Sequence, residues 1–164
     1  MTTRVLVLGD THLRLGAGLP TPVLELAERA DHVVHTGDLV RIDVLDTLAA
    51  LAPVTAVAGN VDDAEVASRL PEHATIELDG VTIGVVHDGG RSDGRHERLR
   101  GLFPGAGIVA YGHSHMPELT TLEDGLVVCN PGSATQRRRA PTHTVAWFEI
   151  RAGAVTGADL VHLD

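Results

Sequence analysis

The stretch Val5-Leu6-Val7-Leu8-Gly9-Asp10-Thr11-His12 is a short apolar run that ends in a glycine and two metal-capable side chains. The same pattern recurs twice, where residues 32–36 lead into Gly37-Asp38 and residues 54–58 lead into Gly59-Asn60. Between these runs, residues 22–30 and 43–51 carry apolar side chains at helical spacing. The order predicts a βαβαβ opening, and near-continuous apolar strands are typical of a parallel sheet covered on both faces.

The second half of the chain has a different pattern. Residues 74–78 and 81–86 are joined by Asp79-Gly80, a two-residue hairpin signal. One helix is expected at residues 93–103. Further strands are expected at 108–111, 118–122, 126–129, 144–150 and 154–163. We therefore predict an α/β protein with mixed sheets, parallel in its front half and rich in hairpins in its back half.

Length and composition indicate one globular domain over residues 1–164. The formal charge is −9, all 13 basic residues are arginine, and there are only four Phe, Trp or Tyr residues, so binding of nucleic acid by charge and stacking is not expected. The single Cys129 excludes an internal disulfide. Because no signal peptide or membrane-length apolar stretch is evident, we expect a cytoplasmic protein that does not enter a membrane.

The residues that follow the predicted strands share one chemical property, the ability to bind a metal ion through oxygen or nitrogen. They are Asp10, His12, Asp38, Asn60, His87, His113 and His115. Ligands of open α/β sheets gather at the carboxyl ends of the strands. In extended backbone, residues two apart point the same way, so we expect the two pairs of alternating donors to face one cavity. We expect the glycines before four of the donors to permit sharp turns and close approach, and Asp38 to bridge two ions.

These motifs resemble the calcineurin-like metallophosphoesterases, and within them the small single-domain phosphodiesterase branch. The matching segments are Asp10-Thr11-His12, Gly37-Asp38, Gly59-Asn60, His87, Gly112-His113-Ser114-His115 and Asn130-Pro131-Gly132-Ser133. The resemblance runs from about Val5 to about Ile150. It implies a four-layer α-β-β-α sandwich with two mixed sheets and a metal site at the carboxyl ends of the strands.

The resemblance also implies a ligand set. The first ion would be held by Asp10, His12 and His115, and the second by Asn60, His87 and His113, while Asp38 would bridge them together with a water or hydroxide. Asp38, Asn60 and His113 are the residues we expect to act directly in catalysis. Such donors suit Mn²⁺, Fe, Zn²⁺ or Ni²⁺, with Mn²⁺ the first choice for an assay. No organic cofactor is expected.

The implied activity is hydrolysis of a small-molecule phosphoester, most simply a phosphodiester, by the hydroxide that bridges the two ions. Many superfamily members carry a histidine after the Gly-Asn pair, where it is taken to protonate the leaving group; here Val61 occupies that position. We therefore expect reliance on the metals and a preference for good leaving groups, with Asp62 orienting a neighbour of the site.

Two other functions stay open, a phosphomonoesterase and a non-catalytic metal-binding scaffold of the same fold. A nucleotide-binding module would need a glycine-rich phosphate loop, which residues 9–12 do not match. A homo-oligomer is compatible with the sequence.

Several further residues have ordinary roles as their first interpretation. His35 and Cys129 are expected to be buried, and residues 137–139 to form a solvated loop. The alternative for these three arginines is recruitment of a substrate phosphate. For Asp88 and His96 both a contact near the site and a plain surface role are open, and residues 130–133 are expected to support the site.

Overall fold

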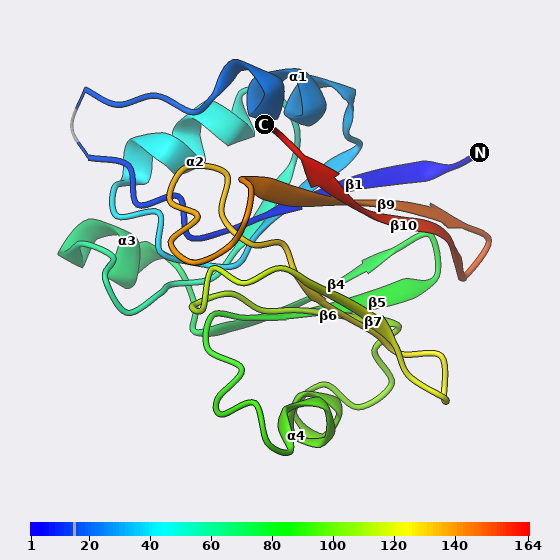
Figure 1. Cartoon of the computed structure of the whole chain (residues 1–164). Helices are drawn as coiled ribbons and strands as arrows, with labels where there is room; N and C mark the ends of the chain where they lie inside the picture. The colour runs from blue at the N-terminus through cyan, green and yellow to red at the C-terminus, as the bar shows by residue number, and fades with distance from the viewer. Residues whose placement is uncertain (15) are drawn as a thin grey trace.

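Strand β1 (Thr3–Leu8) is apolar on both of its faces, and this property explains the layers of the molecule. Val5 and Val7 contribute to the core between the two sheets. Leu6 and Leu8 pack in a second core beneath helices α1 (Thr21–Arg29) and α2 (Ile42–Ala49). A third core lies between the other sheet and helix α4 (Arg95–Leu102). The computed structural model, which describes residues 1–14 and 16–164, thus has the predicted α-β-β-α layering (Figure 1).

The first sheet has the order β10-β9-β1-β2-β3. Strands β1, β2 and β3 are parallel, as predicted, and β9 joins β1 in the antiparallel direction. The other members of this sheet are β2 (His32–His35), β3 (Val54–Ala56), β9 (Thr144–Arg151) and β10 (Ala154–His162). The final hairpin therefore completes the sheet that the first half of the chain begins.

The second sheet has the order β4-β5-β6-β8-β7. Its hairpins match the predicted pattern, and because β5, β6 and β8 pair in parallel, this sheet is mixed, as expected. Its strands are β4 (His73–Leu78), β5 (Val81–Val86), β6 (Ile108–Ala110), β7 (Glu118–Thr121) and β8 (Val127–Asn130). The parallel pairs matter because they bring the carboxyl ends of β5 and β6 to one edge.

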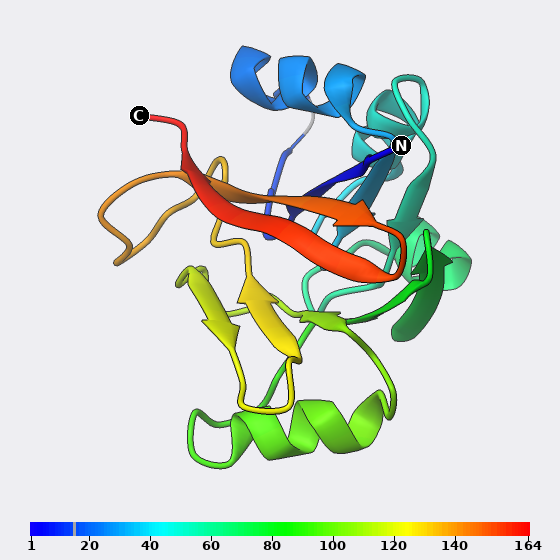
Figure 2. The same cartoon turned by 90° about the vertical axis from the view of Figure 1, so that its right-hand side faces the viewer.

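Helices α1 and α4 cover opposite outer faces of the sandwich, as the turned view shows (Figure 2). Helix α3 (Ala64–Arg69) was not predicted, because six residues are too few for a clear periodic pattern. Its start nevertheless has a local signal, since the side chain of Asp63 accepts a hydrogen bond from the Val66 amide. Within the described residues, no helix combines the length and the apolar character needed to cross a membrane.

Candidate metal centre

The seven donors predicted from the sequence meet where the carboxyl ends of strands from both sheets come together. Asp10 and His12 follow β1, Asp38 follows β2, and Asn60 follows β3 in the first sheet. His87 directly follows β5, and residues 113–115 follow β6 in the second sheet. The site is therefore built by both sheets, and it depends on their packing against each other.

Asp10, His12 and His115 form the first group of donors. Oδ1 of Asp10 lies 3.7 Å from Nε2 of His115 and 3.9 Å from Nε2 of His12. The two imidazole nitrogens are 3.1 Å apart. One ligand atom from each residue falls within 4.8 Å of the others, a spacing that one cation can span.

Asp38 stands between the two groups. Its Oδ2 atom lies 3.3 Å from Nε2 of His12 and 3.3 Å from Nε2 of His87. Its Oδ1 atom accepts a hydrogen bond from the Val61 amide at 3.0 Å. Because the Val61 amide fixes Oδ1, Oδ2 is held at equal distances from His12 and His87. These two histidines follow strands of different sheets.

Asn60, His87 and His113 form the second group. Oδ1 of Asn60 lies 2.9 Å from Nε2 of His87 and 3.0 Å from Nδ1 of His113. Asn60 and His113 are exposed to solvent, whereas His87 is buried. The second group thus forms the open side of the site, where a substrate can approach.

Two of the histidines are oriented by backbone carbonyl groups. Nδ1 of His87 donates to the carbonyl oxygen of Thr36 at 2.8 Å. Nδ1 of His115 donates to the carbonyl oxygen of Gln136. Since a carbonyl can only accept, the proton of each neutral ring is placed on Nδ1 and the lone pair of Nε2 points into the site, which is how metal-binding histidines are commonly held.

The buried carboxylates have unusual electrostatics. Burial raises the pKa of Asp10 to about 7. Its Oδ2 atom is buried and has no hydrogen-bond partner within residues 1–14 and 16–164. Burial also disfavours the charged form of Asp38, but hydrogen bonds from His12, His87 and the Val61 amide outweigh that effect and hold its pKa below the ordinary value. The other oxygen of Asp10, Oδ1, accepts from the His113 amide at 3.2 Å and is the one that faces the imidazoles of His12 and His115. A buried carboxylate with one oxygen left without a partner and the other beside two imidazole nitrogens fits a divalent cation.

The backbone at five of the seven donors is left-handed rather than extended, which corrects our expectation for the alternating pairs. Positive φ angles occur at Asp10 (49°), His12 (44°), Asp38 (59°), His113 (72°) and His115 (61°). Each of these conformations costs of order 1–3 kcal/mol in a residue other than glycine, and such residues cluster at functional sites. The donors reach one cavity because of this tightly turned backbone, not because of strand alternation.

Close approach, more than sharp turning, explains the glycines that precede the donors. A Cβ atom on Gly59 would lie 2.1 Å from Oδ1 of Asp38 and 2.4 Å from its backbone nitrogen. Of the four glycines, only Gly37 has a positive φ angle (102°). Close approach thus explains all four glycines, whereas a sharp turn explains Gly37 alone.

Asp62 ties two donor loops together. Its carboxylate accepts hydrogen bonds from the amides of Gly59 (2.6 Å), Val40 (2.6 Å) and Asp38 (3.2 Å). It does not contact a donor side chain in any of these bonds. Its effect is on the backbone that carries Asp38 and Asn60, a more specific role than the sequence indicated.

The segment of residues 130–133 supports the site, as its position after a strand suggested. Nδ2 of Asn130 donates to the carbonyl of Gly112 and to Oγ of Ser114, both at 3.1 Å. Oγ of Ser133 donates to the carbonyl of Asp10 at 2.8 Å. These bonds fix the loops after β1 and β6 relative to each other.

The family follows from a comparison of sequences. The calcineurin-like phosphoesterase superfamily domain matches residues 3–153. The chain belongs to this superfamily. Both the family and the sandwich fold expected from the motifs are thereby confirmed.

Individual relatives of this calcineurin-like phosphoesterase support the same placement. A probable metallophosphoesterase of Methanothermobacter thermautotrophicus is 35% identical over 135 residues, which span 80% of this chain and 77% of the relative. The crystal structure of Vps29 with Zn²⁺ from Entamoeba histolytica is 26% identical with a TM-score of 0.75, covering 99% and 100% of the two chains. An archaeal phosphodiesterase, at 18% identity and a TM-score of 0.71 over 97% and 100%, shows a likeness of fold alone.

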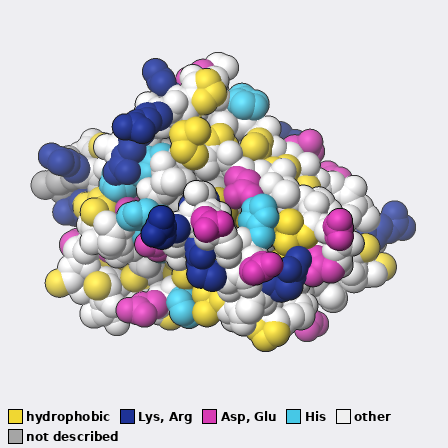
Figure 3. All heavy atoms as spheres, turned by 60° about the horizontal axis from the view of Figure 1, so that its bottom comes forward, with side chains coloured by type: hydrophobic (Ala, Val, Ile, Leu, Met, Phe, Trp, Pro, Cys, Tyr) yellow, Lys and Arg dark blue, Asp and Glu magenta, His cyan; other side chains and the backbone are white. Residues whose placement is uncertain are grey.

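Other residues considered from the sequence lie outside the donor cluster of the phosphoesterase. His35 is buried and contacts Oγ1 of Thr11 and the amide of Gly37, both at 3.1 Å. His96 pairs with Glu118 rather than with any donor. Cys129 is buried, as expected, and residues 137–139 are exposed. Acidic and arginine side chains are interspersed over the centre of the face in Figure 3, which gives no single-signed surface there.

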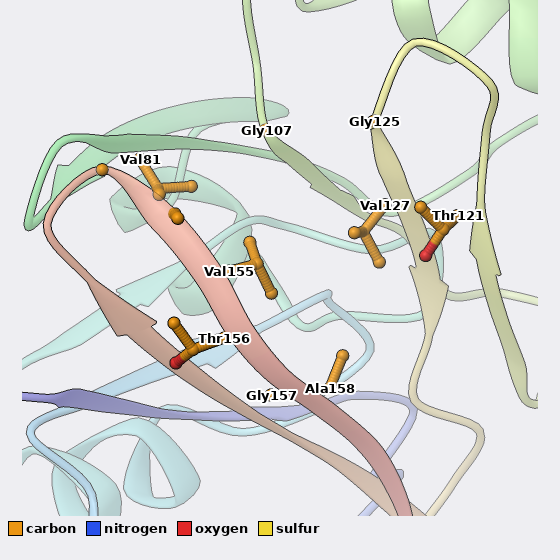
Figure 4. Close-up of a pocket in the computed structure, with 11 residues that line it drawn as sticks. Val81, Gly107, Thr121, Gly125, Val127, Val155, Thr156, Gly157 and Ala158 are labelled. Atoms are coloured by element: carbon orange, nitrogen blue, oxygen red, sulfur yellow. The ribbon is translucent and has the colours of Figure 1, made fainter.

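A hollow of about 400 Å³ lies at the far end of the sandwich (Figure 4). It is bordered by the start of β5 and β8 and by the first residues of β10, including Val81, Val127 and Val155. No titratable side chain lines it. This hollow therefore offers no acid, base or metal-binding side chain, in contrast to the end where the donors meet.

Three interactions at the site have no signal in the sequence. The carbonyl groups of Thr36 and Gln136 orient histidines, but every residue has a carbonyl, so no residue type marks the role. Thr135 similarly donates to the carbonyl of Thr11. Asp62 was expected to support the site, but its action on backbone amides was not, and neither was the cap that the adjacent Asp63 forms on α3.

Proposed function

We propose that this member of the superfamily is a phosphodiesterase that uses two divalent metal ions to hydrolyse small phosphoesters. The observation that carries the proposal is the position of Oδ2 of Asp38, at 3.3 Å from both His12 and His87. A carboxylate oxygen shared by two donor groups is what a two-ion centre requires. The single domain over residues 1–164 would contain the whole site.

The residues divide between the two ions according to the groups described above. Asp10, His12 and His115 would hold the first ion, Asn60, His87 and His113 the second, and Asp38 both. When bound, two such ions lower the pKa of a shared water and neutralise charge on the phosphate oxygens. The chain supplies orientation, because the carbonyls of Thr36 and Gln136 keep the two buried histidines aimed at the site.

The exposed donors define the side from which the substrate enters. Asn60 and His113 face solvent and lie beside the phosphate position that the proposal implies. Val61, in place of a histidine, offers no proton to a leaving group, and its amide is used to hold Asp38. We therefore expect faster hydrolysis of esters with acidic leaving groups.

The test measures bound metal and hydrolysis together. Purified protein is loaded with Mn²⁺ and assayed on bis(p-nitrophenyl) phosphate and p-nitrophenyl phosphate. We expect diesterase activity that falls at least about 100-fold in Asp38→Asn and in His115→Ala. The matched control is His143→Ala, which removes a histidine paired with Asp164 outside the donor cluster and should retain activity. Full activity in both site variants would contradict the proposal.

A metal-binding role without catalysis is the second candidate. It is favoured by the similarity to Vps29, which is described as vacuolar protein sorting 29 and whose Entamoeba histolytica form binds Zn²⁺. Tight binding of metal without hydrolysis of either ester would support this alternative. Hydrolysis of the monoester in preference to the diester would instead identify a phosphomonoesterase.

The absent histidine gives a separate test. If the shortage of a proton donor limits the reaction, Val61→His should increase hydrolysis of esters with poor leaving groups more than that of nitrophenyl esters. Equal rates for wild type and variant on poor leaving groups would remove the support for this explanation.

A further inference from the structure

A pocket adjoins the second donor group. It has a volume of about 410 Å³, and it is lined on one side by Asn60 and His87. We call it the side pocket, defined by Ala58, Asn60, Leu70, Glu72, His87 and Asp88. Because two of its lining residues are donors, a substituent on a phosphate held at the metal centre could extend directly into it.

The side pocket has a distinct chemical character. Its apolar wall includes Ala58 and Leu70. Its ionisable lining residues are two acids, Glu72 and Asp88, and two histidines, His73 and His87, of which His87 belongs to the donor group. No arginine lines it. Arg98 lines a separate hollow with Asp88, and its guanidinium donates to backbone carbonyls, including that of Asp93 at 2.8 Å.

The opposite side of the site carries charge of the other sign. The exposed loop of residues 137–139, three arginines, follows Gln136, whose carbonyl orients His115. Burial of the ring and, to a smaller extent, the charge of Arg138 together lower the pKa of His115 to about 4, which places this arginine near that side of the site. The charge around the site is thus asymmetric, with cations on the side of His115 and acids on the side of Asn60.

Resting on the proposed function, we propose that the side pocket receives a positively charged, alkylammonium-bearing substituent of the phosphoester substrate. The carboxylates of Glu72 and Asp88 would attract the ammonium group, and Leu70 would contact its carbon atoms. A second phosphate or a carboxylate in this position would be repelled by the same two acids.

The experiment compares two ligands that differ only in charge. Phosphocholine has a trimethylammonium group, and 3,3-dimethylbutyl phosphate has a neutral tert-butyl group of the same shape. Binding of each to the Mn²⁺-loaded protein is measured by titration calorimetry, and each is also tested as an inhibitor of bis(p-nitrophenyl) phosphate hydrolysis. We expect phosphocholine to bind about three- to tenfold more tightly at low ionic strength, as two exposed ion pairs allow, with a smaller ratio at high salt.

Variants assign the preference to the side pocket. Glu72→Gln and Asp88→Asn should each reduce the affinity ratio, and the double variant should bring it close to one. Asn at position 88 can still accept the hydrogen bond that Oδ1 of Asp88 receives from the Gly90 amide at 2.8 Å, so the turn is kept. Glu77→Gln is the control, because it removes the same charge from an exposed position on β4 outside the pocket.

The outcomes separate this inference from the proposed function. If the diester is hydrolysed but the two ligands bind equally, or the ratio survives in the double variant, the charge preference of the side pocket is wrong and the phosphodiesterase proposal stands. If neither ligand binds and no ester is hydrolysed, the proposed function fails and this inference fails with it.

Discussion

At the end of the sandwich remote from the donors, Asp79-Gly80 and Ala152-Gly153 turn the chain between paired strands with two successive positive φ angles. At the donor end, the positive φ angles fall on aspartates and histidines, as at Asp38 and His113. At the remote end, two residues with positive φ match the twist of a hairpin, and the two turns are also joined to each other, since the Ala152 amide donates to Oδ2 of Asp79 at 3.0 Å. The donor loops are not hairpin turns, so their strained backbone is maintained by hydrogen bonds to the rest of the fold.

The largest effect should come from closing the space beside the bridging carboxylate. Gly59→Ala would place a Cβ atom 2.4 Å from the backbone nitrogen of Asp38. We expect the free energy of unfolding, measured by urea denaturation, to fall by about 3 kcal/mol. We also expect Mn²⁺ binding, measured by equilibrium dialysis, to be lost. Gly101→Ala on α4 is the control, where nothing lies within 4 Å and the stability should rise by about 0.5–1 kcal/mol. Similar changes in stability for Gly59→Ala and Gly101→Ala would contradict the close packing that we assign to the donor end.

The next effect tests the residue that ties two donor loops together. Asp62→Ala removes the acceptor of three amides, so we expect about 2–3 kcal/mol of destabilisation and about 10- to 100-fold weaker Mn²⁺ binding. Asp63→Ala removes only the cap of α3 and should cost about 1 kcal/mol with no change in metal affinity. If both variants bind Mn²⁺ as tightly as wild type, Asp62 does not position the site.

A pH effect should follow from the buried histidine beneath the donor loops. Burial lowers the pKa of His35 to about 3 in the folded chain, against 6.5 for the ordinary side chain. Between these values the unfolded chain binds the additional proton, so stability is lost as the pH falls below 6.5, by about 1.4 kcal/mol per pH unit for this one group.

The measurement is urea denaturation of the metal-free protein between pH 7 and pH 4. His35→Gln removes the titrating group, so the difference in stability between wild type and variant should change with pH. A difference that is constant over this range would show that His35 is not the source.

The smallest effect should come from the remote end. Ala152 has a φ angle of 50° in the turn between β9 and β10. Ala152→Gly relieves this conformation and should raise the free energy of unfolding by about 1 kcal/mol, without a change in metal binding. At the donor end, His113→Gly relieves a similar strain but removes one of the proposed ligands, so it should weaken metal binding. A decrease in stability for Ala152→Gly would show that local strain does not limit this turn.

The sequence predicts the layers and the members of the donor cluster because both depend on local patterns. Apolar runs define the strands, and the residue after each strand lies at a known edge of the sheet, which is why Asp38 and His87 could be placed near each other. The conformation of the donors could not be predicted, since a positive φ at His12 depends on contacts with distant residues. Helix α3 was too short to show a period.

The supporting contacts of the site could be predicted only in part. The position of residues 130–133 after a strand indicated a supporting role, but not that Ser133 would bond to the carbonyl of Asp10. Asp62 was expected to orient a neighbour of the site, yet the identity of its three amide partners depends on the packing of two loops. Contacts through backbone carbonyls cannot be predicted from the sequence, because every residue type has a carbonyl group.

The central claim is that Asp38 joins two donor groups into one centre for two ions. The most direct measurement is the number of Mn²⁺ ions bound per chain, determined by equilibrium dialysis for wild type and for Asp38→Asn. Our account predicts two ions in the wild type and a loss of at least one in the variant. One ion or none in the wild type, or two ions held equally tightly by the variant, would contradict it.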